Sequence, residues 1–131
     1  MKRILFVFLF PLLIFSQKSD LKFYEVFSKS QNSKVSCYRI PSIITTDKGT
    51  IIAAADERVS SCNDLKSNRD INIVIRTSND EGKSWSSINR LIDYPFGESA
   101  SDPSMIFDKK RKQIYLFYNY MNLEKNKDVY Y

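Results

Sequence analysis

Short runs of β-branched and aromatic residues, separated by turn residues, recur through most of this chain. Runs of four to eight such residues favour strands, and no window after residue 16 repeats apolar positions at helical spacing. Gly49 ends a tight turn that begins at Asp47, and residues 108–112 link a second pair of runs in the same way. The pattern predicts an all-β fold of short antiparallel strands, which means a sandwich, a barrel or a propeller. The expected strands are Phe23–Phe27, Tyr38–Thr46, Ile51–Ala55, Ile71–Thr77, Ile88–Asp93, Ser104–Phe107 and Gln113–Tyr120.

The first 16 residues have a different character. A basic start at Lys2 and Arg3 precedes an apolar run from Ile4 to Phe15, and small Ser16 follows. This run is too short for a stable membrane span, which needs about 20 apolar residues. We expect residues 1–16 to be a cleaved signal peptide that directs the chain to the periplasm, the cell surface or the medium. An uncleaved anchor remains the alternative.

Charge and residue types exclude several kinds of site. The chain carries 20 Lys and Arg against 15 Asp and Glu, and the densest cationic run, Lys109–Lys112, resembles a solvated turn. No base-stacking or groove-reading motif accompanies this run, so we expect no nucleic-acid partner. The chain contains no histidine, which excludes a histidine triad and a His-ligated metal within it. We therefore expect no metal and no cofactor.

The two cysteines, Cys37 and Cys62, allow one intramolecular pairing. Export would permit a disulfide between them, and two buried thiols are the alternative. The longest stretch between expected strands, residues 56–70, is rich in charged and amide side chains. Long loops in compact β proteins are commonly functional or flexible, so we expect chemistry there first.

One segment, Ser78–Trp85, fits the Asp-box pattern Ser-x-Asp-x-Gly-x-Ser/Thr-Trp. Asp80 can accept hydrogen bonds from backbone N–H groups of its own turn, Gly82 can supply a left-handed backbone, and Trp85 can place a large ring between neighbouring strands. We expect a structural role for this box, with no part in catalysis. The pattern occurs in propellers of several functions.

Arg39 lies within an apolar run, in Tyr-Arg-Ile-Pro. Burial of a guanidinium is costly without an anionic partner. Its planar fork suits bidentate recognition of a carboxylate. These four residues alone allow two interpretations: Arg39 forms a salt bridge with a carboxylate of the protein, or it binds the carboxylate of a ligand.

The motifs together resemble the bacterial sialidase family. Tyr-Arg-Ile-Pro is followed by Asp56-Glu57-Arg58, by the polar loop with Asp64 and by the Asp box, and Ser101-Asp102-Pro103-Ser104 resembles a further family segment. This resemblance covers about residues 35–120. It implies a six-bladed β-propeller of antiparallel blades, of which this chain would hold about one and a half. Residues 17–131 would form the N-terminal part of that domain, truncated at the end, because residues 128–131 have the composition of a strand just beginning.

The resemblance also assigns roles to single residues. Arg39 would be the first of three arginines that clamp the carboxylate of sialic acid, and Arg58 would line the floor of the site near a ring hydroxyl. A salt bridge of Arg58 with Asp56 or Asp70 is the alternative. Asp64 would be the general acid and base, with Asp70 as its rival.

Asp102 would contact polar groups of the sugar, and a turn before Pro103 is the alternative. A disulfide between Cys37 and Cys62 would pin the loop with the acid to the arginine strand, because each cysteine lies two residues before a site residue.

The implied activity is that of a retaining exo-α-sialidase acting on sialylated glycans. The tyrosine nucleophile with its glutamate, and two further arginines, would lie beyond residue 131, so we expect the isolated chain to be inactive. A trans-sialidase and a non-catalytic Asp-box propeller that binds glycans are the alternatives.

Overall fold

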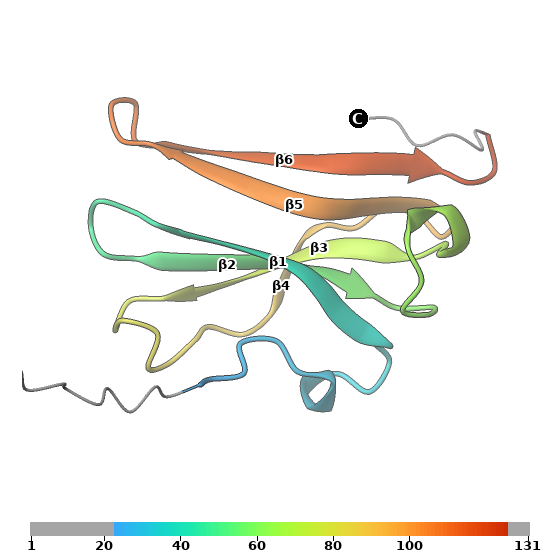
Figure 1. Cartoon of the computed structure of the whole chain (residues 1–131), viewed down its shortest axis with the longest axis horizontal. Coiled ribbons are helices and arrows are strands. Elements are labelled where there is room, and N and C mark those ends of the chain that lie inside the picture. The colour runs from blue at the N-terminus through green and yellow to red at the C-terminus, as the bar shows by residue number, and fades with distance from the viewer. Residues whose placement is uncertain (1–22, 126–131) are drawn as a thin grey trace, which may run out of the picture.

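The computed structural model describes residues 23–125, which form two antiparallel sheets (Figure 1). Four strands pair in chain order in the first sheet, and two strands form a hairpin in the second. The all-β antiparallel expectation is therefore confirmed. The first sheet contains β1 (Cys37–Thr45), β2 (Ile51–Arg58), β3 (Ile71–Ser78) and β4 (Asn89–Ile92), and the hairpin contains β5 (Glu98–Asp108) and β6 (Gln113–Asn122). Two short 3-10 helices, η1 (Lys29–Gln31) and η2 (Leu65–Ser67), lie between them.

Three strand predictions differ from the structure. The expected strand Phe23–Phe27 is absent, since this segment pairs with no other strand and Phe23 is 90 % exposed. Strand β2 continues three residues further than expected, to Arg58, because its charged end pairs with both β1 and β3. Strand β5 begins at Glu98, six residues before the expected start at Ser104. The expected signal peptide and the expected strand at residues 128–131 lie outside the described residues.

The first sheet packs against the hairpin through small side chains. Ala54 of β2, on the same face as Asp56, is fully inaccessible, and Ser99 and Ser101 of β5 are almost fully buried. Small residues at this interface allow the two sheets to approach closely. Leu65, Ile71 and Met121 form a compact cluster at one end of the interface. The hairpin thus lies across one face of the first sheet, and the opposite face carries the N-terminal segment (Figure 1).

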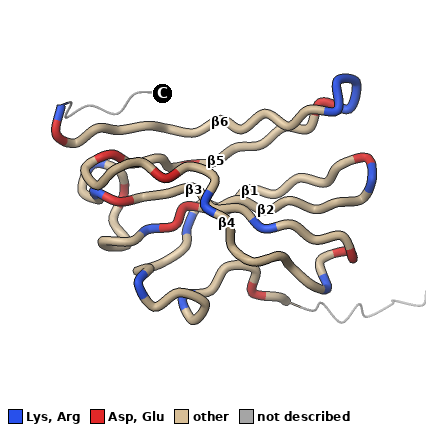
Figure 2. The backbone as a smooth tube through the Cα atoms, turned by 180° about the vertical axis from the view of Figure 1, so that it is seen from behind, with Lys and Arg blue, Asp and Glu red and all other residues tan. Residues whose placement is uncertain are grey.

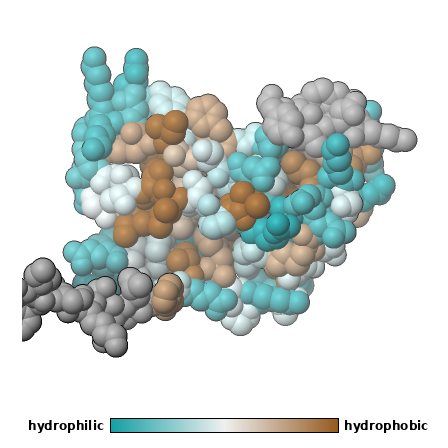
Figure 3. All heavy atoms as spheres, viewed as in Figure 1, coloured by the Kyte–Doolittle hydropathy of each residue, from teal (hydrophilic) through white to brown (hydrophobic). Residues whose placement is uncertain are grey.

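Towards its tip, the face of the hairpin that also carries Asn119 and Met121 leaves large apolar residues exposed. Ile106 pairs with Tyr115 and Ser104 pairs with Phe117, so Ile106, Tyr115 and Phe117 share one face. All three are substantially exposed. Figure 3 shows apolar patches between the polar regions on the side of the molecule seen in Figure 1. Most basic residues instead lie in turns, and the cationic run Lys109–Lys112 forms the exposed tip between β5 and β6 (Figure 2).

The Ser78–Trp85 segment forms a closed turn after β3. The carboxylate of Asp80 accepts hydrogen bonds from the backbone N–H and the hydroxyl of Ser84, and these bonds lower its pKa to about 2. Gly82 has a φ of +83°, a conformation that glycine adopts without strain. The indole N–H of Trp85 donates to the Gly82 carbonyl at 3.1 Å, so the half-buried ring lies against its own turn.

Candidate active site

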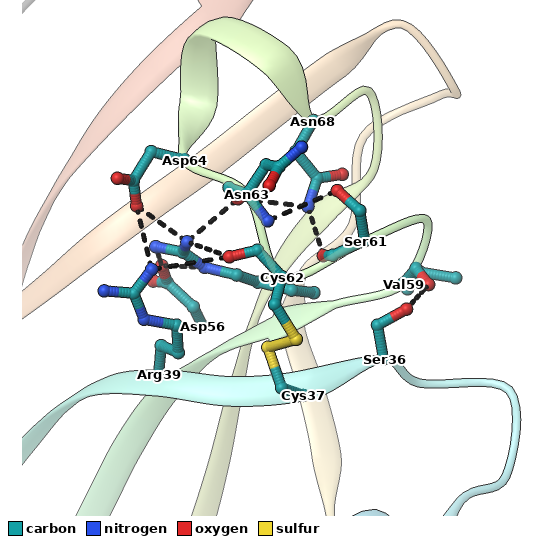
Figure 4. Close-up of a disulfide and its surroundings, with 11 residues drawn as sticks. Ser36, Cys37, Arg39, Asp56, Val59, Ser61, Cys62, Asn63, Asp64 and Asn68 are labelled. Carbon is teal, nitrogen blue, oxygen red and sulfur yellow. Dashed lines mark hydrogen bonds and ion pairs between the residues drawn. A yellow bond between two sulfur atoms is a disulfide. The ribbon is translucent and has the colours of Figure 1, made fainter.

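A disulfide connects strand β1 to the loop that follows β2. Cys37 at the start of β1 is bonded to Cys62, with their Cα atoms 5.7 Å apart. Beside it, the Ser36 hydroxyl donates to the carbonyl of Val59 at 2.8 Å. These links hold the Asp64 loop above the end of β1, as Figure 4 shows.

Two arginines converge on the carboxylate of Asp64. Nη1 of Arg58 donates to Oδ1 of Asp64 at 2.7 Å, and Nη1 of Arg39 donates to the same oxygen at 3.3 Å (Figure 4). Arg58 is buried, whereas the side chain of Asp64 is 76 % exposed. The loop therefore exposes the carboxylate of Asp64 to solvent, while its Oδ1 is bound by the buried Arg58.

The backbone of the same loop helps to hold both guanidinium groups. Nη1 of Arg58 also donates to the carbonyls of Cys62 and Asn63, at 3.0 and 2.9 Å. The Cys62 carbonyl accepts a longer bond from Arg39 as well. The disulfide thus fixes the loop carbonyls that position the arginines.

Asp56 lies beneath this cluster and joins the two sheets. Its carboxylate accepts from Nε and Nη2 of Arg58 at 3.2 and 2.9 Å, from the Ser101 hydroxyl at 2.6 Å and from the backbone N–H of Asp102 at 2.9 Å. Asp56 and Arg58 alternate with Glu57 on β2, so both side chains face the hairpin. Of the two partners considered for Arg58 in a salt bridge, the structure contains Asp56, while Asp70 accepts from Asn72 instead.

Asp102 sits in a bulge of β5 and not in a turn. The register of β5 and β6 shifts between Ser101 and Ser104, and Asp102 has a φ of +60°. Its Oδ2 accepts from the side-chain amide of Asn119 at 2.7 Å. Such a conformation is costly outside glycine, and the bond from its N–H to Asp56 helps to maintain it.

A pocket of about 400 Å³ brings the predicted residues together. Arg39 and Asp64 line it from the first sheet and its loop, and Asp102 and Asn119 line it from the hairpin. Arg58 is buried below and is not part of this lining. The pocket therefore combines a half-exposed guanidinium, an exposed carboxylate and a second carboxylate, all supplied by separate elements.

The two carboxyl groups below and beside the pocket differ in their pKa shifts. The hydrogen bond from Arg58 is the main cause that lowers the pKa of Asp64, and the charge of Arg39 adds to it. Burial raises the pKa of Asp56, although hydrogen bonds from Ser101 and Arg58 oppose this shift. Because every contact to the Asp56 oxygens comes from a donor, the geometry suits its ionised form.

The opposite face of the first sheet holds a second group of charges. Glu57 is buried there and accepts from Nε of Arg90, and the Tyr38 hydroxyl lies 3.4 Å from its carboxylate. Arg76 donates to three backbone carbonyls, including that of Val26. Arg76 and Arg90 are thus strand residues held by local partners and are remote from Asp64 in the sheet.

Neither a metal site nor a membrane helix emerges within residues 23–125. No three of the His, Cys, Asp and Glu side chains in this range are grouped so that they could bind a metal ion. None of the helices in the same range has the length and apolar character needed to cross a bilayer.

Sialidases are among the known proteins that this chain resembles. The chain is 37 % identical over 105 residues to an anhydrosialidase from Macrobdella decora, a match that covers 64 % of this chain and 14 % of the relative. It is 30 % identical over 86 residues to a sialidase from Bacteroides fragilis, covering 60 % and 15 %. The chain is a sialidase homologue. No family model matches it.

Solved structures agree with the sequence comparison. This sialidase homologue superimposes on the leech intramolecular trans-sialidase with a TM-score of 0.68 at 28 % identity, covering 79 % of the chain and 18 % of that structure. The intramolecular trans-sialidase from Ruminococcus gnavus gives a TM-score of 0.66 at 29 % identity, covering 74 % and 24 %. The chain therefore spans less than a quarter of the length of these relatives.

Several residues of the pocket were not identified from the sequence. Asn119 lies in a strand whose composition gives no sign of a site, and Ser101 belongs to a family-like segment that predicts a role for Asp102 alone. For Asp56 the sequence predicts only a salt bridge with Arg58. The alternation of Asp56 and Arg58 at strand spacing was the available signal, because two opposite charges on one buried face of a strand must find partners.

Proposed function

We propose that this chain is the first part of an exported exo-α-sialidase of the six-bladed propeller type. The first sheet would be one blade and the hairpin the start of the next, with residues 1–16 removed as a signal peptide. The observation that supports the proposal is the pocket in which Arg39, Asp64 and Asp102 meet. Their identities and order match the family, and the homologues are sialidases.

In this proposal, Arg39 binds the carboxylate of a terminal sialic acid. Its side chain is 45 % exposed and its contact with Asp64 is long, so a ligand carboxylate can compete for it. Asp102, held by Asn119, would accept hydrogen bonds from polar groups of the sugar. Arg58 would act mainly by holding Asp64 in place, since it is buried beneath the pocket.

Asp64 supplies the proton for the departing oxygen. Arg58 binds Oδ1, which leaves Oδ2 free to carry that proton. In the unliganded chain the pKa of Asp64 is lowered by Arg58 and Arg39. A bound sugar that takes up Arg39 and excludes water would raise this pKa. The proton then passes to the glycosidic oxygen, which keeps the electron pair of the breaking C–O bond.

The experiment compares two substrates in the full-length protein. Asp64→Ala should lower kcat/KM for 3′-sialyllactose by about 100-fold or more, the usual contribution of a general acid. The loss should be much smaller with a 4-methylumbelliferyl sialoside, since that leaving group needs little protonation. Arg39→Ala should impair both substrates, and Arg111→Ala on the distant β5–β6 turn should impair neither. Equal losses for Asp64→Ala on both substrates would contradict its role as the acid.

The isolated 131-residue chain should show no turnover. It would lack the nucleophile and two arginines of the carboxylate clamp. Release of methylumbelliferone by the purified chain would refute this part of the proposal.

An intramolecular trans-sialidase is the second candidate. An anhydrosialidase is among the curated relatives, and two of the similar structures are intramolecular trans-sialidases, one of them in complex with 2,7-anhydro-Neu5Ac. Mass spectrometry of the product separates the candidates, because the anhydro sugar is lighter than free sialic acid by one water. Transfer to added lactose would instead indicate an intermolecular trans-sialidase. Retained turnover in Asp64→Ala would indicate a different acid. Glycan binding without turnover in the full-length protein, unchanged by Asp64→Ala, would indicate the non-catalytic propeller.

A further inference from the structure

A second pocket adjoins the candidate active site on the side of the Asp64 loop. It has a volume of about 440 Å³, within the range of sites for small ligands. Lys66 lines both this pocket and the first one. The two pockets therefore meet at η2, immediately after Asp64 in the chain.

The lining of this second pocket is cationic over an apolar base. Lys66 and Arg69 contribute the charges, and half-buried Leu123 contributes the apolar surface, while Met121 lies buried behind it. None of the described carboxylates lines it. Lys66 and Arg69 are exposed, and neither takes part in a salt bridge within residues 23–125.

The position of this pocket determines what could occupy it. If Asp64 protonates the leaving oxygen, the leaving group must extend past Asp64, and η2 lies directly beside it. A saccharide has an apolar ring face that suits Leu123. Two unpaired cations above that surface favour a saccharide that carries its own negative charge.

We propose that the second pocket is a subsite for an anionic leaving group, namely a sugar with a carboxylate or sulfate next to the cleaved sialic acid. This inference rests on the proposed sialidase function for the orientation of the substrate. The pocket itself, its charges and its contact with the first pocket do not depend on that function.

Binding without turnover provides the first test. The 131-residue chain is titrated with lactose 6′-sulfate and with lactose, and binding is followed by ligand-observed NMR. We expect selective binding of the sulfated sugar, and a loss of selectivity of about 3- to 10-fold in Lys66→Ala/Arg69→Ala, as for two exposed charge contacts. A control variant with the same loss of charge, Lys109→Ala/Arg111→Ala, should bind like wild type. Equal binding of both sugars to the wild-type chain would overturn the inference, whether or not the full-length protein is active.

Kinetics in the full-length protein distinguish the source of the anion. An α2,8-linked disialoside places a carboxylate in the subsite, 6′-sulfated sialyllactose places a sulfate there, and 3′-sialyllactose is the neutral reference. The Arg69→Ala variant, at a residue that lines the second pocket and not the first, should lose about 3- to 5-fold in kcat/KM on one or both anionic substrates and less than twofold on the neutral one. This preference should weaken at high salt.

Each failure has its own signature. No cleavage of any sialoside by the full-length protein would overturn the proposed function, and the NMR titration then decides on the subsite by itself. Equal loss in Arg69→Ala on all three substrates would overturn the subsite, because Arg69 would then serve the reaction and not the leaving group. Unchanged kinetics on all three would also overturn it.

Discussion

Removal of the disulfide between Cys37 and Cys62 should strongly destabilise the chain. The bond closes a loop with a sequence separation of 25 residues. In the chain-entropy model, a loop of this length contributes about 3.5 kcal/mol at 25 °C, mainly by restricting the unfolded state. Since domains of this size are stable by only about 5–15 kcal/mol, the loss should be a large part of the total.

Urea denaturation of the Cys37→Ser/Cys62→Ser variant measures this effect. With a slope of about 1.5–2 kcal/mol per M, the midpoint should fall by about 2 M. A reducing agent should shift the wild-type midpoint to that of the variant and leave the variant unchanged. Tryptophan fluorescence can follow the transition, because Trp85 is the single tryptophan of the chain.

Ser36→Ala provides the matched control. It removes one hydrogen bond, to Val59, between the same two segments and keeps the disulfide. Its cost should be about 1 kcal/mol, or about 0.5 M urea. If the double cysteine variant shifted the midpoint no more than Ser36→Ala, or if the reducing agent did not affect the wild type, the argument from loop closure would be wrong.

Three further predictions concern stability. Because the pKa of the Asp80 carboxyl is lowered from 3.8 to about 2, its ionised form stabilises the fold above pH 3.8, and this stabilisation is lost as the pH falls towards about 2. Asp80→Asn should therefore have a lower melting temperature than wild type at pH 6, and the two melting temperatures should converge near pH 2. Asp56→Ala should cost about 3 kcal/mol in urea denaturation, because it removes the buried anionic partner of Arg58 and leaves only the exposed carboxylate of Asp64 and two loop carbonyls. A cost below about 1 kcal/mol would show that the pair of Asp56 and Arg58 does not hold the two sheets together. Gly82→Ala should cost about 1 kcal/mol through its positive φ, since the added methyl group would make only an ordinary van der Waals contact, at 3.8 Å, with the Trp85 ring. A neutral effect on the melting temperature would show that the turn adapts.

The positions of the strands could be predicted from the sequence because they depend on the local residue pattern. Six of the described strands fall where β-branched and aromatic runs occur. The failed strand, Phe23–Phe27, has the same composition, but a strand also needs a partner edge, which local pattern does not reveal. The greater length of β2 likewise depends on distant groups that bind its charged side chains, such as the Ser101 hydroxyl on β5, which donates a hydrogen bond to Asp56.

The pocket could be predicted only in part for a similar reason. Arg39, Asp64 and Asp102 have motifs around them, and the structure places all three on one pocket. Asn119 has no motif, and its place there depends on the pairing register of β5 and β6. The composition also does not predict that Arg58 is buried below the residues that line the pocket. Its burial depends on the ion pair with Asp56, which lies beneath it.

The end of β2 has a consequence for the evolution of this site. Asp56, Glu57 and Arg58 point alternately to opposite faces, so insertion or deletion of one residue before them would exchange the faces. Glu57 would then face the pocket lined by Arg39 and Asp64, and Asp56 and Arg58 would face the N-terminal segment. Length changes within β2 before Asp56 should therefore be tolerated only where a bulge compensates for them, of the kind found between Arg39 and Ser42 on the neighbouring strand.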